Sequence, residues 1–265
     1  MSIMEKFNQR VDEVNSLVCV GLDSDLPKIP EKYQQAHNPQ LAFNLDIIRA
    51  THEYTSVYKL NSAFYEVQGK KGWQAMRETV AYLKANYPSI VTICDAKRAD
   101  IGNTSDAYAR SIFDQLGFDA VTLHPYLGSD ALEPFLSRDD KGCIILCRTS
   151  NSGAGELQEL MIDGKPMYQH VAAVVSSQWN SNGNCMLVVG ATAPQTMKAL
   201  REIVGEMTFL VPGVGAQGGD LETTVVNGLN SAGKGLMISA SRSIIFADEP
   251  GAAARELRDA INQYR

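Results

Sequence analysis

The chain has 265 residues, of which 45% are hydrophobic and 20% are charged, and its formal net charge at pH 7 is -6. This composition excludes a disordered chain, a collagen and a small disulfide scaffold, and it fits a globular protein long enough to bury a large core. The negative balance argues against a nucleic-acid-binding surface over the whole molecule, while a local basic pocket for an anionic ligand is compatible with it.

The sequence shows no segment typical of membrane insertion or secretion. No apolar run reaches the roughly 18 residues that a membrane span needs, so we expect no membrane association. Residues 1–14 mix charges such as Glu5 and Lys6 with apolar residues at helical spacing, unlike a secretory signal. An odd number of cysteines favours reduced, buried thiols. We therefore expect a cytoplasmic protein. The cysteines lie within or beside apolar runs, at Cys19, Cys94, Cys143, Cys147 and Cys185.

Short apolar runs alternate with helical stretches along the chain. These runs are rich in Val, Ile, Leu or Cys without alternating polar positions, which is typical of parallel strands buried on both faces. In chain order, the predicted strands are residues 17–22, 56–60, 90–94, 120–123, 143–147, 185–189, 208–211 and 236–239.

Amphipathic segments separate these strands. Residues 72–85 place Trp73, Met76 and Val80 at helical spacing, and we expect these side chains to face the core. Eight strands with crossover helices, and no linker between them, predict a (β/α)8 TIM barrel with residues 1–265 as a single domain. A doubly wound open sheet is the alternative. Further predicted helices are residues 105–116, 166–179, 195–204 and 251–264.

Charged residues stand where the first three strands end, which is where barrels of this type gather their functional groups. Asp23 follows the first strand, Lys59 lies in the second, and the third continues into Asp95 and Lys97. Side chains two positions apart in a strand point to the same face, so Asp95 and Lys97 can enter one site. Such a pair can also be a structural salt bridge, but the second amine of Lys59 and the further carboxylate of Asp100 indicate a functional charge cluster.

The last two strands end in residues suited to a phosphate group. The seventh is followed by the glycine-rich segment 213–219, and the eighth by Ser241 and Arg242. Backbone N–H groups can approach a phosphate closely at glycine, and an arginine can donate two parallel hydrogen bonds. Glycines and an arginine at these two loops match the phosphate site that barrels often build there.

Three motifs in the correct order resemble the orotidine 5'-phosphate decarboxylase family. They are Asp95-x-Lys97-x-x-Asp100-Ile101-Gly102-Asn103-Thr104, the upstream Tyr58-Lys59-Leu60-Asn61 and the downstream Pro212-Gly213-Val214-Gly215. The segment Arg148-Thr149-Ser150-Asn151 is most similar to the longer-chain bacterial type of that family. The resemblance covers almost the whole chain. It implies a (β/α)8 barrel, a homodimer with active sites at the subunit interface, and no metal or organic cofactor. It also implies conversion of orotidine 5'-monophosphate to uridine 5'-monophosphate and CO2, the last step of de novo pyrimidine synthesis.

The resemblance further implies which residues are catalytic. Lys59, Asp95 and Lys97 correspond to the charge network within one subunit, and Asp100 to the member that reaches the partner's site. The chain carries no signature of pyridoxal phosphate, thiamine or a metal, so placed charge is the available means of stabilising a carbanion at C6. Lys97 is the best candidate to stabilise it and then to supply the proton.

The same resemblance implies the substrate contacts. The ribose hydroxyls would be held by Asp23 and Lys59, with Thr104 reaching across the interface. The pyrimidine ring would be bound by Ser150, and the phosphate by Gln217 and Arg242. Many family members have glycine immediately before that arginine, where this chain has Ser241. The other expected contacts are Asn61, Pro212, Gly213 and Ser241.

Two other functions share part of this pattern. Magnesium-dependent enzymes that act on keto-sugar phosphates have a similar Asp-x-Lys-x-x-Asp motif, but they carry an acidic residue where this chain has Lys59, whose charge would repel a divalent ion. A non-catalytic phosphate-binding barrel would tolerate the loss of the lysine and aspartate cluster, yet all four charged members are present. Both alternatives are therefore less favoured than the decarboxylase.

Overall fold

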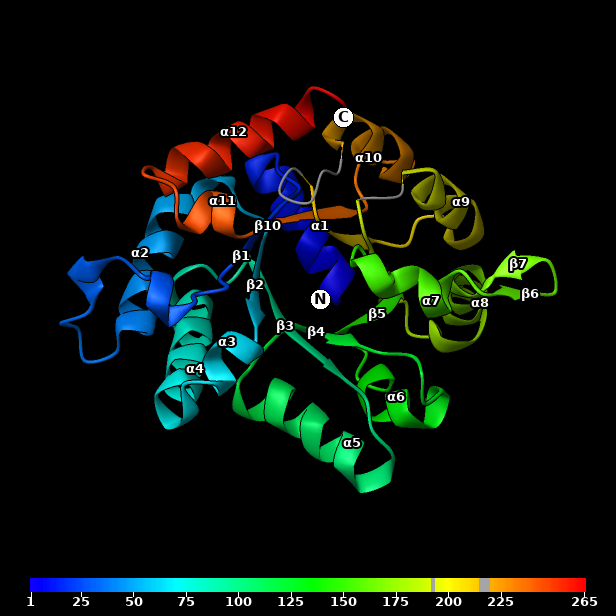
Figure 1. The fold of residues 1–265 in the computed structure, drawn as a ribbon, viewed down its shortest axis with the longest axis horizontal. Coiled ribbons are helices and arrows are strands. Elements are labelled where there is room, and N and C mark those ends of the chain that lie inside the picture. Colours follow the sequence, from blue (N-terminus) through cyan, green and yellow to red (C-terminus); the bar gives the residue numbers. More distant parts are fainter. Residues whose placement is uncertain (192–193, 215–219) are drawn as a thin grey trace.

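A closed barrel of eight parallel strands forms the centre of the computed structural model, which describes residues 1–191, 194–214 and 220–265 (Figure 1). Each strand pairs with the next one around the barrel, and the last strand pairs with the first. The predicted barrel and its eight strands are confirmed, and the open-sheet alternative is wrong. The barrel strands are β1 (Val18–Gly21), β2 (Val57–Asn61), β3 (Val91–Arg98), β4 (Ala120–Leu123), β5 (Gly142–Arg148), β8 (Cys185–Val189), β9 (Phe209–Pro212) and β10 (Leu236–Ala240).

Helices surround the barrel on its outer side (Figure 1). Two of the predicted helices continue in π-helical geometry, α5 through Arg110–Gln115 and α8 through Val175–Trp179. A short antiparallel hairpin, β6 (Met161–Ile162) with β7 (Lys165–Pro166), precedes α8. The helices are α1 (Ile3–Val14), α2 (Pro39–Thr51), α3 (Ala63–Glu66), α4 (Gly69–Asn86), α5 (Gly102–Ala109), α6 (Ser129–Leu136), α7 (Gly155–Gln158), α8 (Met167–Val174), α9 (Pro194–Val204), α10 (Leu221–Gly228), α11 (Arg242–Ile245) and α12 (Pro250–Asn262). Short 3-10 turns are Leu26–Lys28, Glu31–Tyr33, His52–Tyr54 and Ser152–Ala154.

Helix α1 closes the end of the barrel at which the strands begin. Ser2 and Glu5 form a reciprocal cap that starts the helix, and its apolar face, including Phe7, is buried. Lys6 Nζ lies 2.9 Å from a carboxylate oxygen of Asp119, the residue directly before β4. The strand ends at the opposite side of the barrel are therefore the face on which a site can form.

The core confirms most of the predicted helical faces. Met76 and Val80 of α4 are buried, but Trp73 is 40% exposed, so its predicted place in the core is wrong. Trp73 lies near the start of α4, where it lines a groove shared with Tyr108 of α5. All five cysteines are free and buried, as expected. Within the described residues, no helix is long and apolar enough to cross a membrane. The cytoplasmic location stays a prediction.

The register between strands brings distant parts of the sequence to one level of the barrel. Gly21 of β1 is paired with Lys59 of β2, and Asn61 of β2 with Asp95 of β3. On the other side of β1, Val20 is paired with Ala240 at the end of β10. Because the strands are parallel, the residues that follow these pairs all emerge at the same end of the barrel.

Candidate active site

A cavity of about 590 Å3 opens at the carboxyl ends of the strands. It is lined by ten residues that were singled out from the sequence. Four are charged residues from the first three strands and the loop after β1: Asp23, Lys59, Asp95 and Lys97. The others come from β2 and from the ends of β5, β9 and β10: Asn61, Ser150, Pro212, Gly213, Ser241 and Arg242. The structure thus brings these side chains together, while their individual roles stay predictions.

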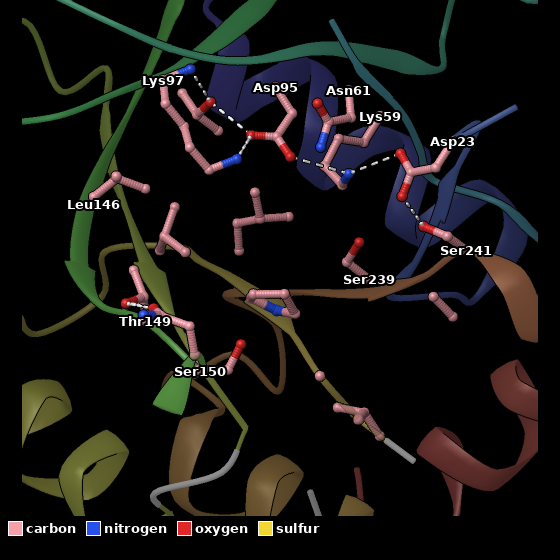
Figure 2. Close-up of a pocket in the computed structure, with 18 of the residues that line it drawn as sticks. Asp23, Lys59, Asn61, Asp95, Lys97, Leu146, Thr149, Ser150, Ser239 and Ser241 are labelled. Atoms are coloured by element: carbon pink, nitrogen blue, oxygen red, sulfur yellow. Dashed lines mark hydrogen bonds and ion pairs between the residues drawn. The ribbon is translucent and has the colours of Figure 1, made fainter. Parts of the chain in front are cut away.

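The charged residues form a row of alternating sign along one wall of the cavity (Figure 2). Lys59 Nζ lies 3.5 Å from Oδ1 of Asp23 and 3.2 Å from Oδ2 of Asp95. Lys97 Nζ lies 2.7 Å from Oδ1 of Asp95. We call Asp23, Lys59, Asp95 and Lys97 the charge row. Each internal member has an opposite charge on either side, which offsets the cost of removing these groups from water.

Burial and neighbouring charges act in opposite directions on the two central members. Burial by itself lowers the pKa of Lys59, but the attraction of Asp23 and Asp95 outweighs it and raises this pKa above its ordinary value. Burial by itself raises the pKa of Asp95, but Lys59 and Lys97 outweigh it and bring the pKa to about 2. Both groups are therefore charged at neutral pH.

Lys97, at one end of the row, carries its accessible ammonium group. Its side chain is 49% exposed, whereas that of Lys59 is 7% exposed. The backbone of Lys97 has a φ of 48°, in the left-handed region, and the pairing of β3 with β4 shifts register between Cys94 and Arg98. An accessible ammonium that is hydrogen-bonded to a carboxylate is suited to donate a proton to a bound molecule.

Thr122 of β4 supports this arrangement and was missed in the sequence. Its hydroxyl donates to Oδ1 of Asp95 across 2.8 Å and accepts a hydrogen bond from the backbone N–H of Lys97 across 3.0 Å. The signal for it was weak, a single polar residue inside an otherwise apolar strand. Thr122 therefore holds the Asp95 carboxylate and the backbone of Lys97 in place relative to the barrel wall.

Thr149 and Ser150 lie across the cavity from Lys97 and Asp95 (Figure 2). The side-chain amide of Gln158 accepts from the backbone N–H of Thr149 and donates to the Thr149 hydroxyl, each across 2.8 Å. A Cβ at Gly190 would lie 2.8 Å from Cβ of Ser150, so the loop packs closely on the end of β8. Gln158 also lines the cavity. No feature of the sequence pointed to it.

The ends of β9 and β10 complete the cavity. Gly213 has a φ of 96°, which favours glycine at this position. Arg242 is exposed at the start of α11 and lines the cavity. Ser241 donates a hydrogen bond to Oδ2 of Asp23 across 2.7 Å. Gln217, the other expected phosphate contact, lies outside the described residues.

Comparison with known proteins identifies relatives of this chain. The model of the orotidine 5'-phosphate decarboxylase / HUMPS family matches residues 16–257. The chain belongs to this family. It is 46% identical to an orotidine 5'-phosphate decarboxylase of Cellvibrio japonicus and 48% identical to one of Halobacterium salinarum, in both cases over 100% of either chain. A solved structure of Leishmania donovani OMP decarboxylase superposes with a TM-score of 0.90 at 39% identity, covering 100% of this chain and 99% of the other.

Two residues implied by the resemblance to the decarboxylases, Asp100 and Thr104, do not line this cavity. Asp100 follows β3 and accepts a hydrogen bond from the backbone N–H of Ile101 across 2.7 Å. Thr104, in the first turns of α5, lines the groove between α4 and α5. Both lie on a segment whose exposed side chains include Ile101, which is 62% exposed. Their expected reach into a partner's site stays a prediction.

The acidic side chains of the cavity are arranged around lysines and not as a set of metal ligands. Among the residues that the structure describes, no three His, Cys, Asp or Glu side chains are grouped so that they could hold a metal ion. The carboxylates of the cavity wall, Asp23 and Asp95, instead face the ammonium group of Lys59. Independence from metals and cofactors stays a prediction.

Proposed function

We propose that the chain is an orotidine 5'-phosphate decarboxylase that acts as one catalytic domain and needs neither a metal nor an organic cofactor. It would convert orotidine 5'-monophosphate to uridine 5'-monophosphate and CO2 in de novo pyrimidine synthesis, in the cytoplasm. The observation that carries the proposal is the charge row, which ends in the accessible ammonium of Lys97 inside a nucleotide-sized cavity. The names of the full-length relatives support it.

The reaction breaks the bond between C6 of the pyrimidine and its carboxylate. CO2 leaves, and the electron pair stays on C6 in the plane of the ring, where the adjacent π system cannot readily delocalise it. A positive charge fixed beside C6 stabilises this pair. Lys97 would provide that charge and then transfer a proton from Nζ to C6, which yields the product. Lysine is suited to both steps, whereas arginine keeps the charge but is a much weaker acid.

The carboxylates of the site would have two roles. Asp95 orients the Lys97 ammonium across 2.7 Å, and together with the partner's Asp100 it would lie near the carboxylate of the substrate. Two like charges about 4 Å apart repel by about 4 kcal/mol at an effective dielectric near 20, while enzymes lower barriers by up to roughly 20 kcal/mol. Relief of repulsion would therefore contribute, but stabilisation of the carbanion by Lys97 has to supply more.

The rest of the cavity would bind the remainder of the nucleotide. Arg242 and the backbone at Gly213 would hold the phosphate, with Gln217 from the segment between them. Asp23 and Lys59 would bind ribose hydroxyls. Ser150, which lies across the cavity from the charge row, would bind the pyrimidine ring. Contacts with the distant phosphate can lower the barrier at C6 if they help to exclude water from the site. Asn61 and Pro212 would complete the walls.

We further infer a homodimer in which Asp100 and Thr104 complete the site of the partner subunit. The exposed segment that carries them supports this assignment. Mixed dimers of Lys97→Ala and Asp100→Asn subunits would contain one site with both residues intact. Mixing the two inactive variants should restore up to about half of the wild-type activity per mixed dimer. No recovery from verified mixed dimers would contradict the exchange of residues.

The direct test follows the loss of ultraviolet absorbance of orotidine 5'-monophosphate in the presence of a metal chelator. We expect turnover by the wild type and loss of turnover in Lys97→Ala. If the folded wild type is inactive with and without chelator, the decarboxylase proposal is wrong, and the magnesium-dependent conversion of keto-sugar phosphates would be tested next. Turnover that the chelator abolishes would contradict metal independence alone.

A further inference from the structure

We propose that Ser241 is a positioning residue that acts through Asp23 and thereby sets the enzyme's preference for an intact ribose, in place of the direct substrate contact expected from the sequence. This inference rests on the proposed function, because Asp23 is the carboxylate assigned there to a ribose hydroxyl. Its evidence is the hydrogen bond from the Ser241 hydroxyl to Oδ2 of Asp23, which spans 2.7 Å and joins residues 218 positions apart.

Ser241 occupies a place where serine usually has another role. It immediately precedes α11 at the N-cap position, where a serine side chain commonly accepts a hydrogen bond from the first turn of the helix. Here the side chain makes no such capping bond. The hydroxyl is directed to the loop that follows the neighbouring strand β1 (Figure 2). The stabilisation that a cap gives a helix is replaced by a contact with the charge row.

Gly21 provides the space for this contact. It lies in β1 beside the end of β10, and a Cβ at this position would lie 1.9 Å from Oγ of Ser241 and 3.4 Å from Oδ2 of Asp23. Any side chain at Gly21 would therefore displace the hydroxyl. Glycine in β1 and the inward hydroxyl of Ser241 are thus parts of one arrangement.

The contact orients the Asp23 carboxylate. Its Oδ2 is held by Ser241, and its Oδ1 faces Lys59 at the longer distance of 3.5 Å. The Ser241 bond is consequently the shorter of the two restraints on this side chain. Without it the carboxylate can rotate, and a hydrogen bond to a ribose hydroxyl loses the benefit of a fixed acceptor. Because Arg242 is the next residue, the same turn joins the phosphate end of the cavity to the charge row.

The test measures binding of uridine 5'-monophosphate and of its 2'-deoxy and 3'-deoxy forms by calorimetry. Wild type should bind at least one deoxy form about tenfold or more weakly than the intact nucleotide. Ser241→Ala should reduce this ratio severalfold while leaving affinity for that deoxy form nearly unchanged. In an Asp23→Ala background, Ser241→Ala should change the ratio no further. Equal losses for all three nucleotides, or additive effects of the two substitutions, would show a direct or general structural role and overturn the inference.

A second measurement tests the contact without any nucleotide. Gly21→Ala should lower the melting temperature strongly in the presence of Ser241 and markedly less in a Ser241→Gly background, because the clash is with the hydroxyl. Equal effects in both backgrounds would overturn the Gly21 and Ser241 arrangement. If wild type binds no uridine 5'-monophosphate, the proposed function fails and the ribose preference fails with it. Normal binding with an unchanged ratio in Ser241→Ala overturns this inference alone.

Discussion

Lys97 reaches back along its own strand to Asp95, with Nζ 2.7 Å from Oδ1, while its backbone is in the left-handed region at a φ of 48°. A side chain with a Cβ is disfavoured there by about 1 kcal/mol, whereas glycine is not. The local geometry that turns the ammonium into the cavity is therefore maintained at a cost in stability. This combination of strain and function is common at active sites.

This strain predicts that Lys97→Gly is more stable than Lys97→Ala by about 1 kcal/mol, although both variants lack the ammonium and should be inactive. Urea unfolding of the two variants measures the difference. The same pair of substitutions at Lys84, an exposed helical residue of α4, is the control, and there glycine should be the less stable by about 1 kcal/mol. Equal stabilities of the two Lys97 variants would contradict the backbone argument.

The lowered pKa of Asp95 predicts an acid-sensitive contribution to stability. Its pKa falls from an ordinary 3.8 to about 2 on folding, so the folded state favours the carboxylate. The resulting stabilisation is complete above about pH 5 and is lost as the pH falls from there to about 2, and it amounts to about 2 kcal/mol. The free energy of unfolding of Asp95→Asn should therefore fall less over this interval than that of wild type.

The control for this titration is Asp248→Asn, which removes an exposed carboxyl. It should keep the wild-type dependence on pH. The interpretation would be contradicted if Asp95→Asn and Asp248→Asn lost the same free energy of unfolding between pH 5 and pH 2.

The two hydrogen bonds between Gln158 and Thr149 predict that Gln158 affects substrate binding, although it belongs to no recognised motif. Gln158→Leu removes both hydrogen bonds and leaves a backbone N–H unpaired, which costs about 1–3 kcal/mol. We expect a rise in KM of about tenfold, because the loop that carries Ser150 is no longer held. Gln158→Glu retains an acceptor for the Thr149 N–H and should restore part of the affinity.

A matched substitution, Gln74→Leu, removes a glutamine of α4 whose amide donates to Glu78 on the same helix. It should leave KM unchanged. Steady-state kinetics and urea unfolding of both variants distinguish the two cases. If Gln158→Leu has wild-type KM, the hydrogen bonds between Gln158 and Thr149 have no bearing on substrate binding.

The proposed contact between Arg242 and the phosphate predicts that the effect of this arginine on kcat/KM depends on the phosphate group of the substrate. Arg242→Ala removes a charged donor that is worth up to about 3 kcal/mol, and kcat/KM should fall by up to about 100-fold, with lower kcat as well as weaker binding. The nucleoside orotidine, which has no phosphate, should be turned over equally poorly by wild type and variant. Arg255→Ala, on the exposed side of α12, is the control and should match wild type. An unchanged kcat/KM in Arg242→Ala would exclude the phosphate contact.

The order and type of the barrel elements could be predicted from the sequence, because strands buried on both faces need continuous apolar runs and crossover helices need an apolar stripe. The runs at 17–22 and 56–60 lie at β1 and β2 to within a residue at either end. The Asp95-x-Lys97 pair was accessible for the same reason, since two positions in one strand share a face. Such inferences depend only on neighbours along the chain.

The features that remained hidden depend on contacts between distant segments. The hydrogen bonds from Ser241 to Asp23 and from Thr122 to Asp95 follow from the register of strands around the barrel, which pattern alone does not reveal. Trp73 had the spacing of a core residue, yet near its end of α4 a groove replaces the packed interior. Gln158 lies on a four-residue helix with no periodicity to read. The sequence by itself determined the barrel and its charged strand ends, while packing between distant segments decided which polar groups hold those charges in place.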